Sequence, residues 1–205
     1  GNMSASALNT LNGKVPGTLT VTNAVTLTGT ASDIATAASA DSAGTLALAA
    51  NFGATVSAGA VDAADLITIY GQTSATINAT AATGINGSAA NVHTVIDHAQ
   101  VNHDTNFTVT ISGTSAAAAD LKAIDAITSG VITATGVETI TGSLSDVGDV
   151  VDVDTNKGTA GQQIDIDTDF NVTLSDTGNM SASALNTLNG KVPGTVTVTA
   201  AVTLT

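Results

Sequence analysis

The chain of 205 residues contains no cysteine, no tryptophan and no arginine. Without cysteine, no disulfide bond can stabilise the fold. Aromatic residues make up only 2% of the chain, and Tyr70 is the single tyrosine, so a core must be built from alanine, valine, leucine and isoleucine. A glycosidase combines paired carboxylates with aromatic rings that stack on sugars. The shortage of such rings argues against that class of enzyme.

Positive charge is also scarce. The chain has four lysines and 17 acidic residues, and its formal net charge is −13 at pH 7. Because no basic patch is present to neutralise phosphates, the composition argues against nucleic acid and against an anionic membrane surface as partners. All the acidic residues except Glu138 are aspartates. Divalent cations are the natural counterions of such a chain.

Motifs for catalysis and for membrane insertion are missing as well. No apolar run approaches the length of about 20 residues that a transmembrane helix needs. The chain has neither a G-x-S-x-G nucleophile elbow nor a glycine-rich loop that would cradle a phosphate. We therefore predict that the protein is not an enzyme, that it does not insert into a membrane, and that calcium is its only candidate cofactor.

The most informative feature that is present is a long repeat. The segment 1–28 recurs as 178–205 with two differences, which are Leu19 to Val196 and Asn23 to Ala200. Identity over this length is typical of a tandem array. We expect one full long repeat over 1–177, followed by the start of the next identical repeat at 178–205.

A shorter period appears within the long repeat. Segments 4–29 and 117–142 place apolar residues and glycines at identical spacing, although the residues between them differ. We divide the long repeat into six coils with a mean length of about 29.5 residues, which is typical of solenoid proteins. The predicted coils are 1–29, 30–59, 60–88, 89–114, 115–143 and 144–177.

Each predicted coil has a helical half and a strand half. The first half places apolar residues three or four positions apart, as in Leu8 and Leu11, which predicts one face of a short helix. Ser, Thr or Asp precedes most of these runs, as an N-cap would. The second half alternates threonine with aliphatic residues, which predicts strands with one buried face. Two coils depart from this pattern: we expect a single strand in 89–114, and an aspartate-rich insertion argues against a helix in 144–177.

These patterns predict an α/β repeat solenoid with one short helix and two strands in each coil of about 29 residues. Strands stack about 4.8 Å apart, whereas packed helices lie about 8–10 Å apart. A coil with one helix per strand layer must therefore curve or splay. The alternative is a parallel β-solenoid in which the helical halves are only single turns at the corners.

Aspartates near the end of the long repeat form a candidate metal site. The stretch DVDTNKG (152–158) places Asp152, Asp154 and Asn156 at alternate positions, as at the start of a calcium-binding loop. Asp165 and Asp167 follow on one face of a predicted strand and would complete a calcium site. The alternative is a solvated acidic loop followed by the solvent face of a strand, with no metal.

The three histidines do not favour a second metal site. His93, His98 and His103 lie five residues apart, whereas two ligands on one helix face are expected four residues apart. We therefore predict that they are ordinary side chains of a helix face and of loops.

Rows of threonine suggest ice binding as a further alternative function. The stretches TLTVT (18–22) and TVTVT (195–199) resemble the strands of ice-binding solenoids. Ice binding needs the same face in many adjacent coils, and LALAA (46–50) and IDIDTD (164–169) interrupt it. The β-propensity of threonine explains the rows without that function.

Two segments are similar in composition and spacing to a known group of proteins. ALNTLNGKVPGTVTVTAAVTLT (184–205) and DLKAIDAITSGVITATGVETITG (120–142) resemble the repeat regions of giant secreted bacterial surface proteins, which include repetitive adhesins, S-layer-like proteins and RTX-type fibre proteins. The RTX nonapeptide G-G-x-G-x-D is absent. The resemblance implies secretion to the extracellular cell surface, a fibrous or surface-coating role and calcium-dependent stiffness.

We therefore expect a structural tandem repeat of a long extracellular protein that acts as a spacer, filament or cell-surface layer. Its expected partners are neighbouring repeats of the same chain and other chains that associate laterally into fibres or layers. The alternative is an adhesin module that binds its target through calcium.

Overall fold

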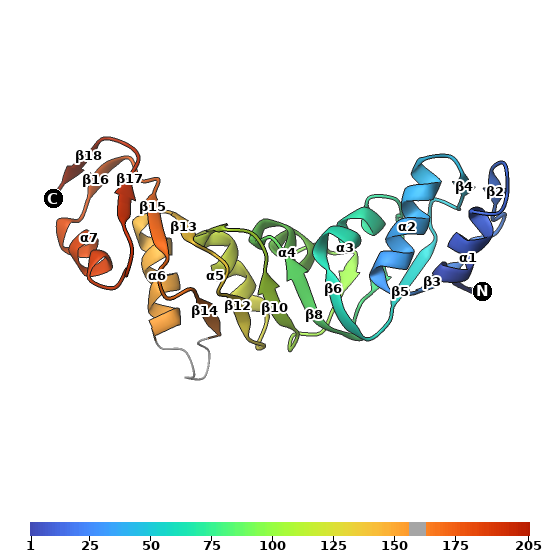
Figure 1. The fold of residues 1–205 in the computed structure, drawn as a ribbon, viewed down its shortest axis with the longest axis horizontal. Helices are drawn as coiled ribbons and strands as arrows, with labels where there is room; N and C mark the ends of the chain where they lie inside the picture. Colours follow the sequence, from blue (N-terminus) through green and yellow to red (C-terminus); the bar gives the residue numbers. More distant parts are fainter. Residues whose placement is uncertain (156–162) are drawn as a thin grey trace. The chain divides into compact units, whose positions relative to one another are not determined.

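The computed structural model describes residues 1–155 and 163–205. These residues form two compact units. Unit 1 consists of Gly1–Asn86 and Thr94–Phe107, and unit 2 consists of Gly87–His93 and Thr108–Thr205. Helices and strands alternate along the chain in both units (Figure 1).

The helices of the described residues are 8 to 12 residues long, which is about two to three turns. The alternative with single turns at the corners is therefore wrong. The helices are α1 (Ala5–Asn12), α2 (Ala31–Ser42), α3 (Ala63–Tyr70), α4 (Ala89–Ile96), α5 (Ala118–Ile127), α6 (Leu144–Thr155) and α7 (Ala182–Asn189).

Unit 1 is built on parallel strands. Its main sheet has five strands, in the order β1 (Asn2–Ser4), β3 (Thr26–Gly29), β5 (Gly53–Val56), β7 (Ile77–Asn78) and β9 (Val101–Asn102). Two further pairs are also parallel; they join β2 (Leu19–Thr20) to β4 (Leu46–Ala47) and β6 (Gly59–Asp62) to β8 (Ala82–Gly87). In this unit α1 packs on α2, and α2 packs on α3.

Unit 2 repeats the same construction. One set of parallel strands runs in the order β10 (Thr108–Ile111), β12 (Ile132–Ala134) and β14 (Ile164–Ile166). A second runs in the order β11 (Ser115–Ala117), β13 (Thr139–Gly142), β15 (Asn171–Leu174) and β17 (Val196–Val198). The last pair joins β16 (Gly178–Met180) to β18 (Val202–Leu204). Here α5 packs on α6, and α6 packs on α7.

Repeating α/β units with parallel sheets are thus confirmed, with two local corrections. The predicted loss of the helix in 144–177 is wrong, because α6 covers Leu144–Thr155. Its valines Val147, Val150 and Val151 are buried, so packing of this face outweighs the preference of aspartate for turns. The prediction of one strand in 89–114 is also wrong, because the range contains both β9 and β10.

The structure shows a larger repeat that contains two helices. Among the described residues, connections between successive helices alternate between two strands and three strands. Two helices and five strands therefore recur three times within 177 residues, or about once every 59 residues.

Phenylalanine marks this larger repeat. The chain has three phenylalanines, and each lies directly before the middle strand of a three-strand connection. Phe52 precedes β5, Phe107 precedes β10 and Phe170 precedes β15, and all three are buried. Among the described residues, the large aromatic rings of the core therefore occupy one equivalent position.

Local sequence explains why these elements form. Ser4, Thr30, Asp62 and Ser181 accept a hydrogen bond from a backbone N–H in the first turn of the helix that follows, which confirms the predicted N-caps. The strands alternate as predicted, and in β10 the two threonines are exposed while Val109 and Ile111 are buried.

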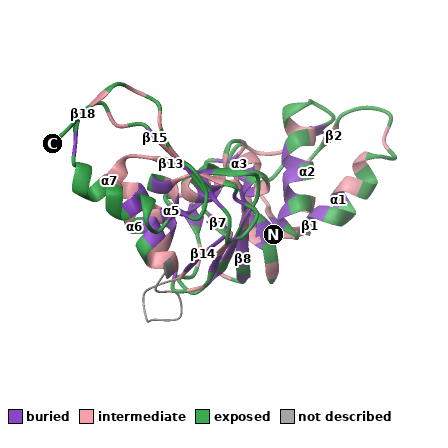
Figure 2. Ribbon diagram, turned by 60° about the vertical axis from the view of Figure 1, so that its left-hand side comes forward, coloured by how far each residue is buried: buried purple, intermediate pink, exposed green. Residues whose placement is uncertain are grey.

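The core of each unit is aliphatic. Leu27, Ile34, Leu66 and Ile69 are fully buried in unit 1, and Leu121, Ile124, Ile132 and Ile140 are fully buried in unit 2. Figure 2 shows buried stretches along the strands and on parts of the helices. Layers of small aliphatic side chains thus replace the aromatic bulk that the composition lacks.

Candidate functional site

The residues predicted to open a calcium loop lie partly in a helix. Asp152 and Asp154 belong to the last turns of α6, and Asn156 lies outside the described residues. The Asp152 carboxylate forms an ion pair with the Lys191 ammonium group. Asp154 Oδ1 accepts a hydrogen bond from the backbone N–H of Ile166 at 2.9 Å. Because residues two apart on a helix do not face each other, these two carboxylates do not converge.

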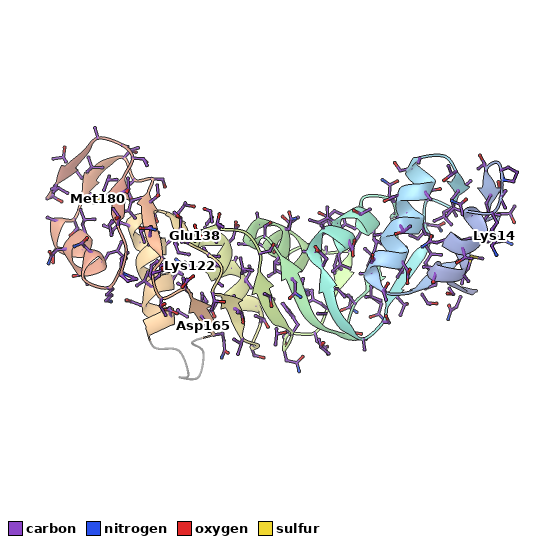
Figure 3. The ribbon with its side chains drawn as sticks, in the orientation of Figure 1. Lys14, Lys122, Glu138, Asp165 and Met180 are labelled. Carbon is purple, nitrogen blue, oxygen red and sulfur yellow. The ribbon has the colours of Figure 1, made fainter. Side chains whose placement is uncertain are left out.

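The other predicted metal ligands lie at and after β14. Asp165 belongs to this strand between the buried residues Ile164 and Ile166 (Figure 3). Asp167 follows the strand, and its Oδ1 accepts a hydrogen bond from the backbone N–H of Thr168 at 2.6 Å. Over residues 1–155 and 163–205, no group of three or more His, Asp or Glu side chains is placed to hold a metal ion. Calcium binding and the adhesin function that depends on it stay predictions.

Each histidine has partners of its own. His93 Nδ1 lies 2.8 Å from Asp120 Oδ1. The His98 ring stacks on Tyr70, with 3.9 Å between the ring centroids and 12° between their planes. His103 Nε2 lies 3.1 Å from the backbone oxygen of Ile96. Each histidine ring therefore contacts residues of its own unit.

Lysine–aspartate pairs join neighbouring helices in unit 2. Lys122 of α5 donates from Nζ to Asp146 Oδ1 at 2.6 Å and to Asp149 Oδ2 at 2.8 Å, both on α6 (Figure 3). Lys191, just after α7, pairs with Asp152 of α6. The hydrogen bond from Lys122, with a second from Ser143, lowers the pKa of Asp146 below its ordinary value of 3.8. These ion pairs are not among the contacts predicted from the sequence, although Lys14 and Lys191 occupy the same position of the repeat.

A groove of about 590 Å³ lies between α6 and α7. Its walls include Asp149, Asp152, Asp176 and Lys191. Asp152 and Lys191 pair with each other, and Asp176 accepts a hydrogen bond from the backbone N–H of Leu144 at 2.7 Å. The pair of Asp152 and Lys191 therefore connects one coil to the next, whereas Asp176 closes a contact within its own coil.

The two copies of the repeated segment bury opposite faces. We call residues 1–28 the N-terminal coil and residues 178–205 the C-terminal coil. Leu27 of the N-terminal coil is fully buried, whereas its equivalent Leu204 is 55% exposed. The relation is reversed at Leu11, which is 50% exposed, and its equivalent Leu188, which is 3% exposed. One sequence thus has two apolar faces, and each copy buries one of them.

In the N-terminal coil the buried face lies against the segment Thr30–Val56. Asn9 donates from Nδ2 to the backbone oxygen of Asp33 at 2.9 Å, and Asn12 donates from Nδ2 to Thr45 Oγ1 at 3.3 Å. Backbone pairing joins β2 to β4 and β3 to β5. Side chains and backbone therefore both hold this face in place.

In the C-terminal coil the buried face lies against α6 and β15. Besides the pair of Lys191 with Asp152, the backbone N–H of Thr195 donates to Asn171 Oδ1 at 2.8 Å, and β17 pairs with β15. The opposite face is open and forms a groove of about 260 Å³ lined by Ala182, Leu185, Asn186, Asn189, Val196, Val198 and Leu204.

The open groove matches the covered face of the other copy. Each of its seven residues has an equivalent in the N-terminal coil, and at five of them that equivalent is more deeply buried. The five pairs are Ala182 and Ala5, Leu185 and Leu8, Asn186 and Asn9, Asn189 and Asn12, and Leu204 and Leu27. The structure therefore shows both the empty surface and the way in which an identical surface is filled.

No family model matches the chain, and no curated protein and no solved structure matches it either. Within the described ranges, no helix has the length and apolar character needed to cross a bilayer.

Proposed function

We propose that the chain is a section of an α/β solenoid that serves as a structural tandem repeat of a long extracellular protein, where it acts as a spacer, filament or surface layer. The observation that carries this proposal is that the two copies of one coil bury opposite faces. A segment with an apolar face on each side needs a neighbour before it and a neighbour after it, as in a stack of repeats.

The exposed ends give the proposal further support. Lys14 is exposed, and it has no ion pair among the residues described, whereas its equivalent Lys191 pairs with Asp152 of the coil before it. Leu11 is half exposed where Leu188 is buried. In an array, a preceding copy of the helix α6 would supply the carboxylate and the apolar surface that the N-terminal coil lacks.

The surface chemistry agrees with an extracellular structural role. The net charge of −13 and the exposed threonines of strands such as β10 keep the chain hydrated with few lysines. The absence of cysteine suits a chain whose stability comes from repeated stacking contacts. Location at the cell surface follows from the resemblance to secreted repeat proteins, and we propose it on that basis.

The proposal is tested by the size of chains that contain one, two and three long repeats. A solenoid grows along one axis, so small-angle X-ray scattering should show a maximum dimension that rises in proportion to repeat number at constant cross-section. A globular array would instead show a radius of gyration that rises with roughly the 0.38 power of chain length. A cross-section that grows with repeat number would rule the solenoid out.

A further inference from the structure

The groove of about 590 Å³ between α6 and α7 lies wholly within unit 2. We propose that it binds an extended basic segment of another protein. A lysine side chain of that segment places its methylene groups on the apolar floor of the groove and its ammonium group beside Asp149 and Asp176. This inference goes beyond the proposed function, because a spacer or filament needs no such partner.

The groove is open at a place where other helices are joined by a side chain. In three pairs of neighbouring helices, the fifth residue of one helix contacts the third residue of the next. These contacts join Asn9 to Asp33, His93 to Asp120 and Lys122 to Asp146. The same two positions of α6 and α7 hold Gly148 and Ala184, and neither residue has a side chain long enough to bridge. The space between these two helices therefore stays unfilled.

Gly148 in the wall of this groove is not required by the fold. It lies inside α6, where glycine is among the poorest helix formers. An added Cβ would meet no neighbouring element within 4 Å, whereas Gly142 has a φ of +150° and a close neighbour. Glycine also lets the main chain of a partner approach closely. Gly148 therefore weakens α6 at the point where a partner segment can pass closest to it.

The floor and the rim of the groove suit a lysine side chain. Its walls include Met180 and Leu188, each 3% exposed, and lysine packs its aliphatic stem on such apolar surface. Asp149 Oδ2 binds Lys122, and Asp176 Oδ2 accepts a hydrogen bond from a backbone N–H. Within the described ranges, the Oδ1 atoms of both aspartates have no hydrogen-bond partner. An ammonium group has three donors, and either oxygen can accept from it.

Charge favours a basic partner. Three aspartates and one lysine line the groove, and the whole chain has a net charge of −13. Such a field attracts a lysine-rich segment and repels an acidic one. The volume of the groove also lies within the range of about 300–1,000 Å³ that is typical of ligand sites.

Fluorescence anisotropy with a labelled peptide tests the proposal on the full chain. The probe is the peptide GLKGLKG with blocked ends, and the control peptides are GLQGLQG and GLEGLEG. We expect the lysine peptide to bind with a Kd below about 1 mM, and its binding to weaken as the salt concentration rises from about 50 to 500 mM. The control peptides should not bind. Absence of binding by the lysine peptide, or equal affinity for spermidine as a small amine, would overturn the proposal.

A pair of leucine substitutions separates the groove from general attraction between opposite charges. Gly148→Leu fills the groove and leaves every charge in place, and Ala126→Leu adds the same side chain at an exposed position of α5. Gly148→Leu should weaken peptide binding about tenfold or more, and Ala126→Leu should leave it unchanged. Because leucine is a better helix former than glycine, the melting temperature of Gly148→Leu should not fall. Unchanged binding by the folded Gly148→Leu chain would refute the site.

Three substitutions of aspartate by asparagine test the carboxylates. Asp149→Asn and Asp176→Asn should each weaken peptide binding roughly threefold or more, because each removes a charged acceptor. Asp104→Asn makes the same change in net charge at an exposed position of unit 1 and should have little effect. Equal effects of all three substitutions would show attraction by net charge alone and would count against the groove.

The methionines give a measurement that needs no substitution in the site. The chain has two of them: Met180 lines the groove, whereas Met3 belongs to unit 1. In NMR spectra of the chain with isotope-labelled methionine methyl groups, the peptide GLKGLKG should shift the Met180 signal and leave the Met3 signal in place. The variant Met3→Leu assigns the two signals. An unchanged Met180 signal, or equal shifts of both signals, would overturn the proposal.

Discussion

Leu11 and Leu188 occupy the same position of the long repeat, yet Leu11 is 50% exposed and Leu188 is 3% exposed. The difference comes from the neighbour that each coil has, because α7 packs on α6. The same residue type in the same local sequence is therefore a surface side chain in one copy and a core side chain in the other.

This pair predicts unequal effects of one substitution. Leu188→Ala should lower the free energy of unfolding by about 2–5 kcal/mol, because it removes a buried side chain and leaves a cavity. Leu11→Ala should change it by less than about 0.5 kcal/mol, as is usual for surface positions. Urea unfolding followed by circular dichroism measures both values, and equal losses would contradict the proposed burial.

Two glycines next to α6 predict opposite effects of alanine. Gly142 has a φ of +150°, and an added Cβ would lie 3.3 Å from the Ala118 Cβ. Gly142→Ala should therefore destabilise the chain by about 1–3 kcal/mol. Gly148 lies within α6, and an added Cβ would meet no other part of the protein within 4 Å, so Gly148→Ala should stabilise the chain by about 0.5–1 kcal/mol. Thermal unfolding of the two variants should shift in opposite directions.

The Lys122 contact predicts a pH effect at Asp146. Because its pKa is lowered in the folded chain, the stability that Asp146 contributes is complete above its ordinary value of 3.8 and is lost as the pH falls through the lowered folded value. Lys122→Met should move the pKa of Asp146 up toward that ordinary value, as measured by carboxyl NMR titration. The variant should also lose less stability on acidification than the unaltered chain, and an unchanged pKa would show that the ion pair is not formed in solution.

Asp125 predicts the opposite pH dependence. Burial raises its pKa, against a smaller opposing effect of the hydrogen bond from the Gln163 backbone, and its Oδ1 is buried without a hydrogen-bond partner. The charged form therefore destabilises the fold at neutral pH, and this cost is relieved as the pH falls through the raised folded pKa. Asp125→Asn should raise the melting temperature at pH 7. The same change at the exposed residue Asp104 should have no such effect, and a lower melting temperature for Asp125→Asn would contradict this assignment.

Much of the fold follows from spacing in the sequence. Apolar residues three or four apart, preceded by Ser4 or Thr30, predict the helices α1 and α2, and threonine alternation predicts strands such as β10. These signals are local, so one sequence is enough to identify them. The larger repeat of two helices and five strands was not predicted, because the spacing of apolar residues is nearly the same in every coil. Only the positions of Phe52, Phe107 and Phe170 mark it in the sequence.

The candidate metal site shows where local signals are insufficient. Aspartates at alternate positions indicate a loop when they are considered alone, but Asp152 and Asp154 follow directly on the buried helical face of Val147, Val150 and Val151. The pairing of Asp152 with Lys191 joins residues that are far apart in sequence. Propensity contains neither such long-range contacts nor the burial of these valines.

The alternation of two-strand and three-strand connections determines how such an array changes in length. Loss of one coil would bring two connections of the same kind together, and loss of a three-strand coil would also remove a middle strand with its phenylalanine. Loss or gain of 177 residues, which span three helix pairs, leaves every junction as it was. In an array of the proposed kind, unequal crossing-over between nearly identical copies would therefore yield shorter or longer proteins that are equally able to fold.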